Sequence, residues 1–171
     1  VELIAADTEK GAAGRIAIKV NSMNDIGVML ALIRASRAGV RVELFIRGIC
    51  CLRPGVPGYT ENIAVRSVVG RYLEHSRIFA FGEGTEQRIF VGSGDLLNRN
   101  TRRRVEAFIE CTAPETRTGV LAILDALRGD KEKSWTMQPD GTYLRGEIVP
   151  GTASHDTLYA YFGAQTVEPL P

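Results

Sequence analysis

The hydrophobic positions at the start of the chain alternate and then recur with a helical period. Apolar residues occupy every second position of residues 15–21, the pattern of a strand with one buried face. Residues 26–38 show helical spacing behind Asn24 or Asp25, either of which can cap a helix. Residues 40–46 alternate again. This order predicts a right-handed strand–helix–strand crossover with two parallel strands.

A long irregular segment follows the second predicted strand. Residues 47–60 contain three glycines and two prolines, a composition that predicts a stiff loop. The loop leaves the carboxyl end of a strand, and ligands bind at that edge of open α/β sheets. The sequence therefore predicts a ligand-binding edge near residue 47.

The remaining pattern predicts shorter elements. They are a weak helix at 1–10, a strand entering a helical turn at 64–72, strands at 77–81, 87–91 and 102–109, a helix at 114–127, a hairpin around Asp140 and Gly141, and a short helix at 156–162. The length and the absence of a low-complexity linker indicate one domain over residues 1–171.

The composition is that of an ordinary globular protein, with 44% hydrophobic and 24% charged residues. No apolar run approaches the roughly 18 residues of a membrane span, so no transmembrane segment is expected. The three cysteines include an adjacent pair, Cys50 and Cys51, which argues against a disulfide framework. We expect a reducing, cytoplasmic compartment, with peripheral membrane association left open.

The net charge is only +1, but the positive charge is concentrated in the middle of the chain. Residues 41–104 contain eleven arginines, no lysine and six acidic residues. The planar guanidinium group suits bidentate contact with phosphate oxygens. This bias favours an anionic ligand, although a solvated basic face would have the same composition.

A histidine motif suggests phosphoryl chemistry. His75 and Arg77 precede a strand pair, and a Gly-Ser-Gly-Asp turn follows at residues 92–95. This arrangement resembles the phospholipase D superfamily, which has His-x-Lys on one strand and a Gly-Ser-x-Asn turn after the next. A histidine can attack phosphorus or carry a proton, while a cation neutralises the phosphate oxygens.

The motif departs from that superfamily in two respects. Arg77 stands in place of the lysine, and residues 78–82 lack the acidic residue that normally follows. The chain also contains one such motif, whereas these sites are built from two. The residues therefore indicate half of an active site and disfavour ordinary phosphodiester hydrolysis.

Longer strings of the sequence resemble bacterial polyphosphate kinase. They are RGICCLRPGVPGYTENIAVRSVVGRYLEHSRIF (47–79), IKVNSMND (18–25), RASRAGV (34–40) and GSGDLLNRN (92–100) with the RRVE that ends at Glu106. The resemblance implies the carboxy-terminal catalytic domain of that family. It implies an α/β, phospholipase-D-like fold with a mixed, mostly parallel sheet flanked by helices.

The resemblance also implies site residues. The nucleotide-phosphate arginine of the family falls on Arg47, and its second-domain histidine falls on His75, which we expect to be catalytic and to bind ATP or phosphate. Lys19, Arg66, Arg77 and Arg104 are expected to belong to the basic lining of a phosphate tunnel, and no metal ligand is expected. Alternatively, Arg47 pairs with an acid such as Glu61 and His75 is structural. His155 has no partner pattern and is expected at the surface.

The implied activity is reversible transfer of the terminal phosphate of ATP to inorganic polyphosphate. A phosphohistidine would form in a preceding domain, and Mg²⁺ would be bound mainly outside residues 1–171. The expected partners are ATP or ADP, polyphosphate and the other domains of the same enzyme, which we expect to be a homo-oligomer; no nucleic acid partner is expected. The isolated chain is expected to be inactive.

Two other functions stay open at this point. One is a phosphodiesterase or nuclease that completes its site by pairing two half-sites. The other is a non-catalytic module that binds polyanions. Activity of the chain alone, compared with its activity beside the missing domain, distinguishes the three.

Overall fold

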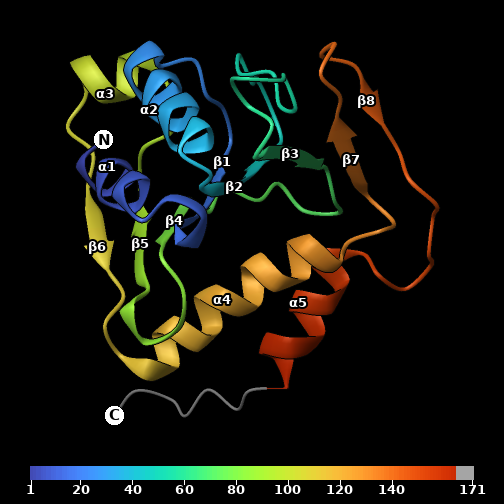
Figure 1. The fold of residues 1–171 in the computed structure, drawn as a ribbon. Coiled ribbons are helices and arrows are strands. Elements are labelled where there is room, and N and C mark those ends of the chain that lie inside the picture. Colours follow the sequence, from blue (N-terminus) through green and yellow to red (C-terminus); the bar gives the residue numbers. More distant parts are fainter. Residues whose placement is uncertain (165–171) are drawn as a thin grey trace.

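The computed structural model describes residues 1–164, which form a single mixed sheet flanked by helices (Figure 1). The strand order within these residues is β6-β5-β4-β1-β2-β3-β7-β8. The strands are β1 (Arg15–Val20), β2 (Arg41–Ile46), β3 (Ile63–Val68), β4 (Ile78–Phe81), β5 (Arg88–Gly92), β6 (Phe108–Glu110), β7 (Ser134–Met137) and β8 (Tyr143–Leu144).

Helices cover both faces of the sheet. They are α1 (Glu2–Glu9), α2 (Ile26–Arg37), α3 (Asn98–Arg103), α4 (Pro114–Gly129) and α5 (Ser154–Gly163), with short 3-10 turns η1 (Gly11–Ala13) and η2 (Gly84–Glu86). Residues of α1 and α2 share one core with the apolar positions of β1 and β2, and α4 belongs to a second core on the opposite face. None of the helices within residues 1–164 is long and apolar enough to cross a bilayer.

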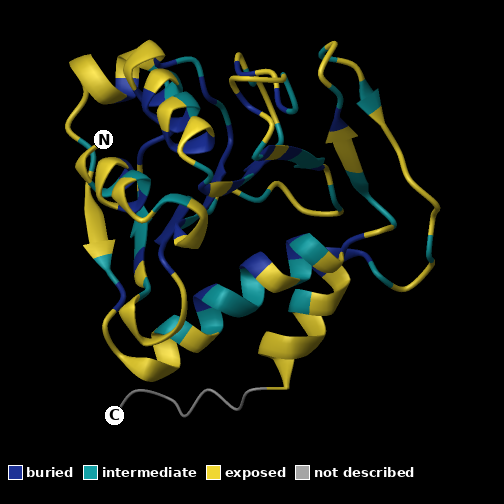
Figure 2. Cartoon of the chain, in the orientation of Figure 1, coloured by how far each residue is buried: buried dark blue, intermediate teal, exposed yellow. Residues whose placement is uncertain are grey.

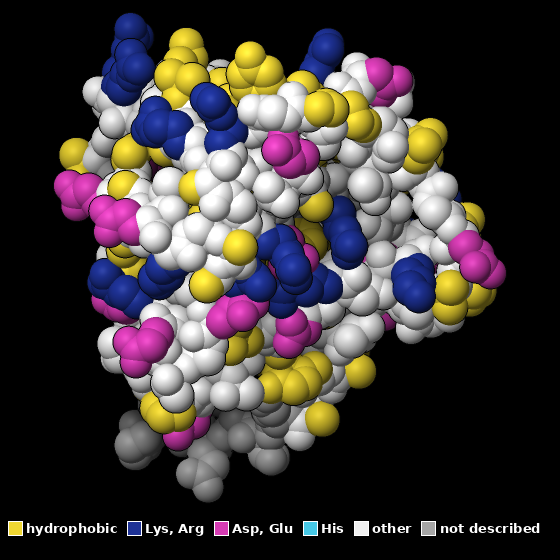
Figure 3. Space-filling view, viewed as in Figure 1, with side chains coloured by type: hydrophobic (Ala, Val, Ile, Leu, Met, Phe, Trp, Pro, Cys, Tyr) yellow, Lys and Arg dark blue, Asp and Glu magenta, His cyan; other side chains and the backbone are white. Residues whose placement is uncertain are grey.

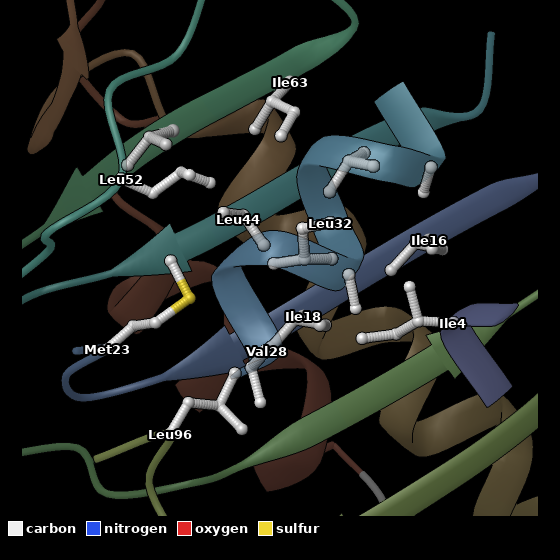
Figure 4. Close-up of a cluster of buried hydrophobic side chains, with 14 of the residues drawn as sticks. Ile4, Ile16, Ile18, Met23, Val28, Leu32, Leu44, Leu52, Ile63 and Leu96 are labelled. Carbon is white, nitrogen blue, oxygen red and sulfur yellow. The ribbon is translucent and has the colours of Figure 1, made fainter. Parts of the chain in front are cut away.

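Alternate side chains of β1 point into these two cores, which lie on opposite faces of the sheet. Ile16 and Ile18 lie in the core beneath α2, where Leu32 and Leu44 also pack (Figure 4). Ala17, the residue between them, lies in the core beneath α4. Figure 2 shows the result, a buried central sheet between helices whose outer sides are exposed. Lys19 follows Ala17 on the α4 side, because neighbouring strand residues point to opposite faces.

The predicted sheet class is confirmed except for the direction of most strands. β1 pairs with β2, and β2 with β3, in parallel. The other five pairings, β1 with β4, β3 with β7, β4 with β5, β5 with β6 and β7 with β8, are antiparallel. The expectation of a mostly parallel sheet is therefore wrong. The crossover supplies the parallel centre. The short connections from β4 to β5 and from β7 to β8 allow only antiparallel pairing of those strands.

Two local predictions were also wrong. The strand expected at 102–109 is α3 followed by β6, because Thr101 Oγ1 donates a hydrogen bond of 2.6 Å to Asp25 and holds a helical turn against α2. The helical turn expected after β3 is absent. At Gly70 a side-chain carbon would lie 2.6 Å from His155 Nδ1, so the chain runs irregularly along that ring.

Asp25, one of the two residues predicted to cap the first long helix, is the N-cap of α2. Its Oδ1 accepts a hydrogen bond of 2.9 Å from the Val28 amide, and its Oδ2 accepts the Thr101 bond. The Thr101 bond, which outweighs burial, lowers the pKa of Asp25. Because its pKa is lowered in the folded state, ionised Asp25 stabilises the fold at pH values above the usual carboxyl pKa. This stabilisation is lost as the pH falls through the folded-state pKa.

We therefore expect Asp25→Ala to lower the free energy of unfolding by about 1–2 kcal/mol. Asp25→Asn should cost much less, because asparagine caps helices nearly as well. Denaturant unfolding of the two variants measures the difference. Equal stability of Asp25→Ala and the wild type would show that the cap is unimportant.

Candidate functional site

Four loops meet at one edge of the sheet. β1 and β2 end together, with Val20 opposite Ile46. β4 runs antiparallel to β1, so its first residue, Ile78, lies beside Lys19 at the same edge. β5 ends there too, with Val91 opposite Ile78. The segments after β1, β2 and β5 and the segment before β4 are thereby gathered where ligands bind in α/β sheets.

Arg47 is the first residue after β2 and is half-buried. Its Nε donates a hydrogen bond of 2.7 Å to Asn21 Oδ1. Among residues 1–164 its terminal nitrogens have no hydrogen bond and its charge has no acidic partner, so the alternative pairing with Glu61 is absent. The guanidinium is thus oriented through one nitrogen and presents the others for a ligand.

The backbone next to Arg47 approaches the end of β1 closely. The Gly48 amide donates a hydrogen bond of 2.8 Å to the Asn21 carbonyl. A side-chain carbon at Gly48 would lie 2.8 Å from both the Asn21 carbonyl oxygen and Ser22 Oγ. Glycine is therefore required here, and the contact fixes the start of the loop that carries Arg47.

Asn21 is held in turn by Asp95, from the predicted Gly-Ser-Gly-Asp turn. Asp95 Oδ1 accepts bonds of 2.8 Å from the Asn21 amide and 3.2 Å from Asn21 Nδ2. Arg77 lies 3.3 Å and 3.4 Å from the two Asp95 oxygens. Burial opposes ionisation of Asp95, but the bonds from Arg77 and Asn21 outweigh it and lower its pKa. A chain of contacts therefore runs from Arg77 through Asp95 and Asn21 to Arg47.

The turn that carries Asp95 is packed against the following segment. Side-chain carbons at Gly92 and Gly94 would lie 2.5 Å from Phe108 and 2.9 Å from Glu106. Glu106 also accepts bonds of 2.5 Å from Ser93 Oγ and 2.6 Å from Asn100 Nδ2. The small residues of this motif thus serve close packing of the turn.

His75 lies in the irregular segment before β4 and is exposed. Within the described residues its ring has no hydrogen bond, and its carbonyl accepts a bond of 3.0 Å from Arg77 Nη1. The residues on either side are linked, because the Ser76 amide donates to Glu74 at 2.5 Å. The imidazole is therefore available to a ligand while its backbone is restrained.

Lys19, expected in the tunnel lining, lies in the interior with 4% of its surface exposed. Its Nζ forms an ion pair with Glu74 and donates a bond of 2.7 Å to the Ser76 carbonyl. Burial lowers the pKa of Lys19, against the effect of Glu74, and the nearby charges of Arg47 and Arg77 lower it further. Burial disfavours ionised Glu74, but the Lys19 and Ser76 bonds outweigh it and lower its pKa.

The other two expected lining residues form no direct hydrogen bond or ion pair with Arg47, Arg77 or Lys19 among residues 1–164. Arg66 Nη1 donates a bond of 2.8 Å to the Arg128 carbonyl at the end of α4. Arg104 pairs with Glu106 at 3.4 Å and is largely exposed. The structure thus brings together Arg47, His75, Arg77 and Lys19 at one edge.

His155 was expected at the surface, and this expectation is wrong. It is the second residue of α5 and is buried, and its Nδ1 accepts a hydrogen bond of 2.9 Å from the Tyr72 amide. Sequence reasoning also missed Asn21 and Asp95 as partners of the site. Their positions directly after a strand and in the glycine turn were the available signal for these two, whereas His155 carried none.

Some arginines in the middle of the chain form ion pairs and others do not. Figure 3 shows basic side chains interspersed with acidic ones on one face. Six of the eleven arginines in residues 41–104 have no ion pair within the described chain, and they are Arg41, Arg47, Arg53, Arg66, Arg99 and Arg103. The described residues include no cluster of three or more His, Cys, Asp or Glu that could hold a metal ion.

Comparison with known proteins connects this site to one family. The family model described as polyphosphate kinase C-terminal domain 2 matches residues 1–157. The polyphosphate kinase of Synechocystis is 46% identical over 157 residues, which are 92% of this chain and 21% of that protein. The Streptomyces coelicolor polyphosphate kinase is 50% identical over 135 residues, 79% of this chain and 18% of that protein. The chain thus spans about a fifth of the length of these relatives.

Solved structures agree with the fold. The crystal structure of polyphosphate kinase from Porphyromonas gingivalis superposes with a TM-score of 0.86 at 32% identity, covering 95% of this chain and 26% of that one. Nuc from Salmonella typhimurium, a phospholipase D family member, has a TM-score of 0.57 at 16% identity. The match covers 80% of this chain and 89% of that one. The second likeness shows the fold alone and confirms the expected phospholipase-D-like architecture.

Proposed function

The chain belongs to the polyphosphate kinase C-terminal domain 2 family, and from this premise we propose that it forms one wall of a site for reversible phosphate transfer between ATP and inorganic polyphosphate. The observation that carries the proposal is the joint presentation of Arg47 and His75 at one sheet edge. Arg47 is held by Asn21 through a single nitrogen, and the His75 ring has no partner among the described residues.

The two side chains suit complementary parts of a phosphoryl transfer. Arg47 can contact two phosphate oxygens through its terminal nitrogens, which neutralises charge that shifts during transfer. His75 can carry a proton or donate a hydrogen bond to the transferring group. The Asn21–Asp95–Arg77 contacts fix Arg47 before the ligand arrives. Such preorganised charge is the main requirement of phosphoryl transfer.

The nucleophile would come from outside this chain. The family resemblance implies that a histidine of the preceding domain becomes phosphorylated, and we place that domain opposite the edge with Arg47 and His75. We expect the full-length enzyme to use ATP or ADP and polyphosphate as substrates and to form a homo-oligomer.

Mg²⁺ does not fit the residues at this edge. The two carboxylates nearest the site are engaged by cations, Asp95 by Arg77 and Glu74 by Lys19, and they leave no free anionic ligands for a hard cation. We propose that Mg²⁺, as an ion that accompanies the nucleotide, is bound mainly by the preceding domain.

The two alternatives have less support. A phosphodiesterase or nuclease would use the cation beside its histidine on the phosphate, but Arg77 is bonded to Asp95 and to the His75 carbonyl. A purely polyanion-binding module would not require the oriented Arg47 beside an unpartnered histidine.

Direct binding tests the proposal on the chain as given. We expect inorganic polyphosphate to bind with an affinity that falls steeply as salt rises, because unpaired arginines would displace condensed counterions. Fluorescence anisotropy of an end-labelled polyphosphate at several salt concentrations measures this. Arg47→Ala should weaken binding and Arg41→Ala, at the opposite end of β2, should weaken it less. No binding at low ionic strength would contradict a basic wall at this edge.

A further inference from the structure

The segment that carries His75 has no regular structure of its own. We call residues 70–76 the His75 loop, which connects β3 to β4 without helix or strand. Leu73 is largely exposed and Tyr72 is half-exposed, so burial of these two side chains does little to hold the loop. A catalytic histidine on such a segment needs external restraint, because misplacement by about 1 Å can cost roughly 10²-fold in rate.

The first restraint comes from beneath the loop. Lys19 reaches out of β1 and contacts the residues on both sides of His75, with an ion pair to Glu74 and a bond of 2.7 Å to the Ser76 carbonyl. The Ser76 amide closes the arrangement with its bond to Glu74. A buried ammonium needs such partners, since an unpaired charge in the interior is strongly unfavourable.

The second restraint comes from α5, 83 residues further along the chain. His155 Nδ1 accepts the Tyr72 amide at 2.9 Å. Its ring also stacks on the Tyr72 ring, with centroids 5.8 Å apart and planes 11° apart. Gly70 lies so close to the imidazole that a side-chain carbon there would be 2.6 Å from Nδ1. His155 therefore fixes the start of the loop as Lys19 fixes its end.

We propose that Lys19 and His155 are positioning residues that hold His75 in its productive place from two sides. The inference rests on the proposed function, because it assigns both residues a role through His75. Lys19 would then position His75 from the interior instead of lining a phosphate tunnel. His155 would have a positioning function that its sequence context does not indicate.

His155 provides the cleaner test, because its hydrogen bond can be removed and restored. His155→Leu removes the acceptor and leaves an amide that water can reach at a half-exposed residue. His155→Asn places a carbonyl oxygen near the position of Nδ1. In the full-length enzyme that contains this chain, we expect His155→Leu to lower kcat about 10- to 100-fold. The KM for ATP should stay near wild type, and His155→Asn should recover most of kcat.

Lys19 is tested by a pair of substitutions. Lys19→Met alone leaves the part-buried Glu74 carboxylate without its cationic partner and can destabilise the domain. Lys19→Met combined with Glu74→Gln removes both charges and keeps an acceptor for the Ser76 amide. We expect this double variant to lower kcat by a similar factor while remaining folded.

The His75→Ala background separates positioning from general damage. If the two anchors act through His75, His155→Leu should cause no further loss in an enzyme that already lacks His75. The Tyr72 amide should also exchange its hydrogen with solvent faster in His155→Leu than in His155→Asn.

Each contrary outcome has a distinct meaning. Equal fold-losses from His155→Leu with and without His75 would overturn the inference and make His155 merely structural. Unchanged kcat in His155→Leu and in the Lys19 double variant, beside a large loss in His75→Ala, would overturn the inference and leave the proposed function standing. Near-normal activity of His75→Ala would overturn both.

Discussion

The isolated chain should make no polyphosphate from ATP at a useful rate. Arg47 and His75 form one side of the proposed site, and the nucleophile would lie in another domain. Holding reacting groups in place is worth effective concentrations of roughly 10⁵–10⁸ M, and this advantage is lost when one side is missing. We therefore expect the largest effect of any change considered, a loss of many orders of magnitude relative to the full-length enzyme.

Gel electrophoresis of the polymer formed from ATP measures this activity directly. The same preparation should still bind polyphosphate, which controls for unfolding. Chain growth by the isolated domain, at a rate comparable with that of the full-length enzyme, would show that residues 1–171 contain a complete site.

The second large effect is expected from Arg47 in the full-length enzyme. Arg47→Ala should lower the rate of phosphate transfer about 10²–10³-fold, because the loss of one preorganised electrostatic partner typically costs about 2.7–4 kcal/mol. Arg47→Lys should lower the rate less than Arg47→Ala, because lysine keeps the positive charge. It should still be slower than the wild type, because an ammonium group cannot bond Asn21 and a phosphate at the same time through one planar group. Steady-state rates of ATP-dependent synthesis measure both.

Arg41 is the matched control for this experiment. It begins β2 and is exposed, whereas Arg47 follows the end of the same strand, about 20 Å away at roughly 3.3 Å per residue. Arg41→Ala should leave the rate of transfer near wild type. Equal losses from Arg41→Ala and Arg47→Ala would indicate a diffuse charge effect and contradict a localised site.

The pH dependence of His75→Ala distinguishes the two roles available to His75. A proton carrier should give a limb in the pH–rate profile that disappears in the variant. A hydrogen-bond donor that stays charged should lower the rate alike at every pH. Near-normal activity with an unchanged melting temperature would make His75 a structural residue.

The central part of the fold was predictable because its periodicities are clear. The alternation of β1 and β2 and the helical spacing of α2 are local patterns, and each is close to its predicted bounds. Strand direction on the flanks was not predictable in the same way, because it depends on where the irregular segment before β4 returns to the sheet. α3 was missed because the Thr101–Asp25 contact, 76 residues apart, fixes its conformation.

The site shows the same division. Sequence motifs predicted Arg47 and His75, and the structure brings both to the edge expected from the strand order. The internal contacts of Lys19 and the burial of His155 depend on residues far apart in sequence, so composition and spacing carried no signal for them. Motifs thus indicated the two residues that we propose to face a ligand, and the folded structure was needed to find the residues that contact their segments.

The most direct test of the central claim is a crystal structure of the full-length enzyme with a non-hydrolysable ATP analogue. We expect phosphate oxygens within hydrogen-bond distance of the terminal nitrogens of Arg47 and of the His75 ring, while Arg47 Nε remains bonded to Asn21. Phosphates bound elsewhere, with Arg47 and His75 both facing solvent, would contradict it.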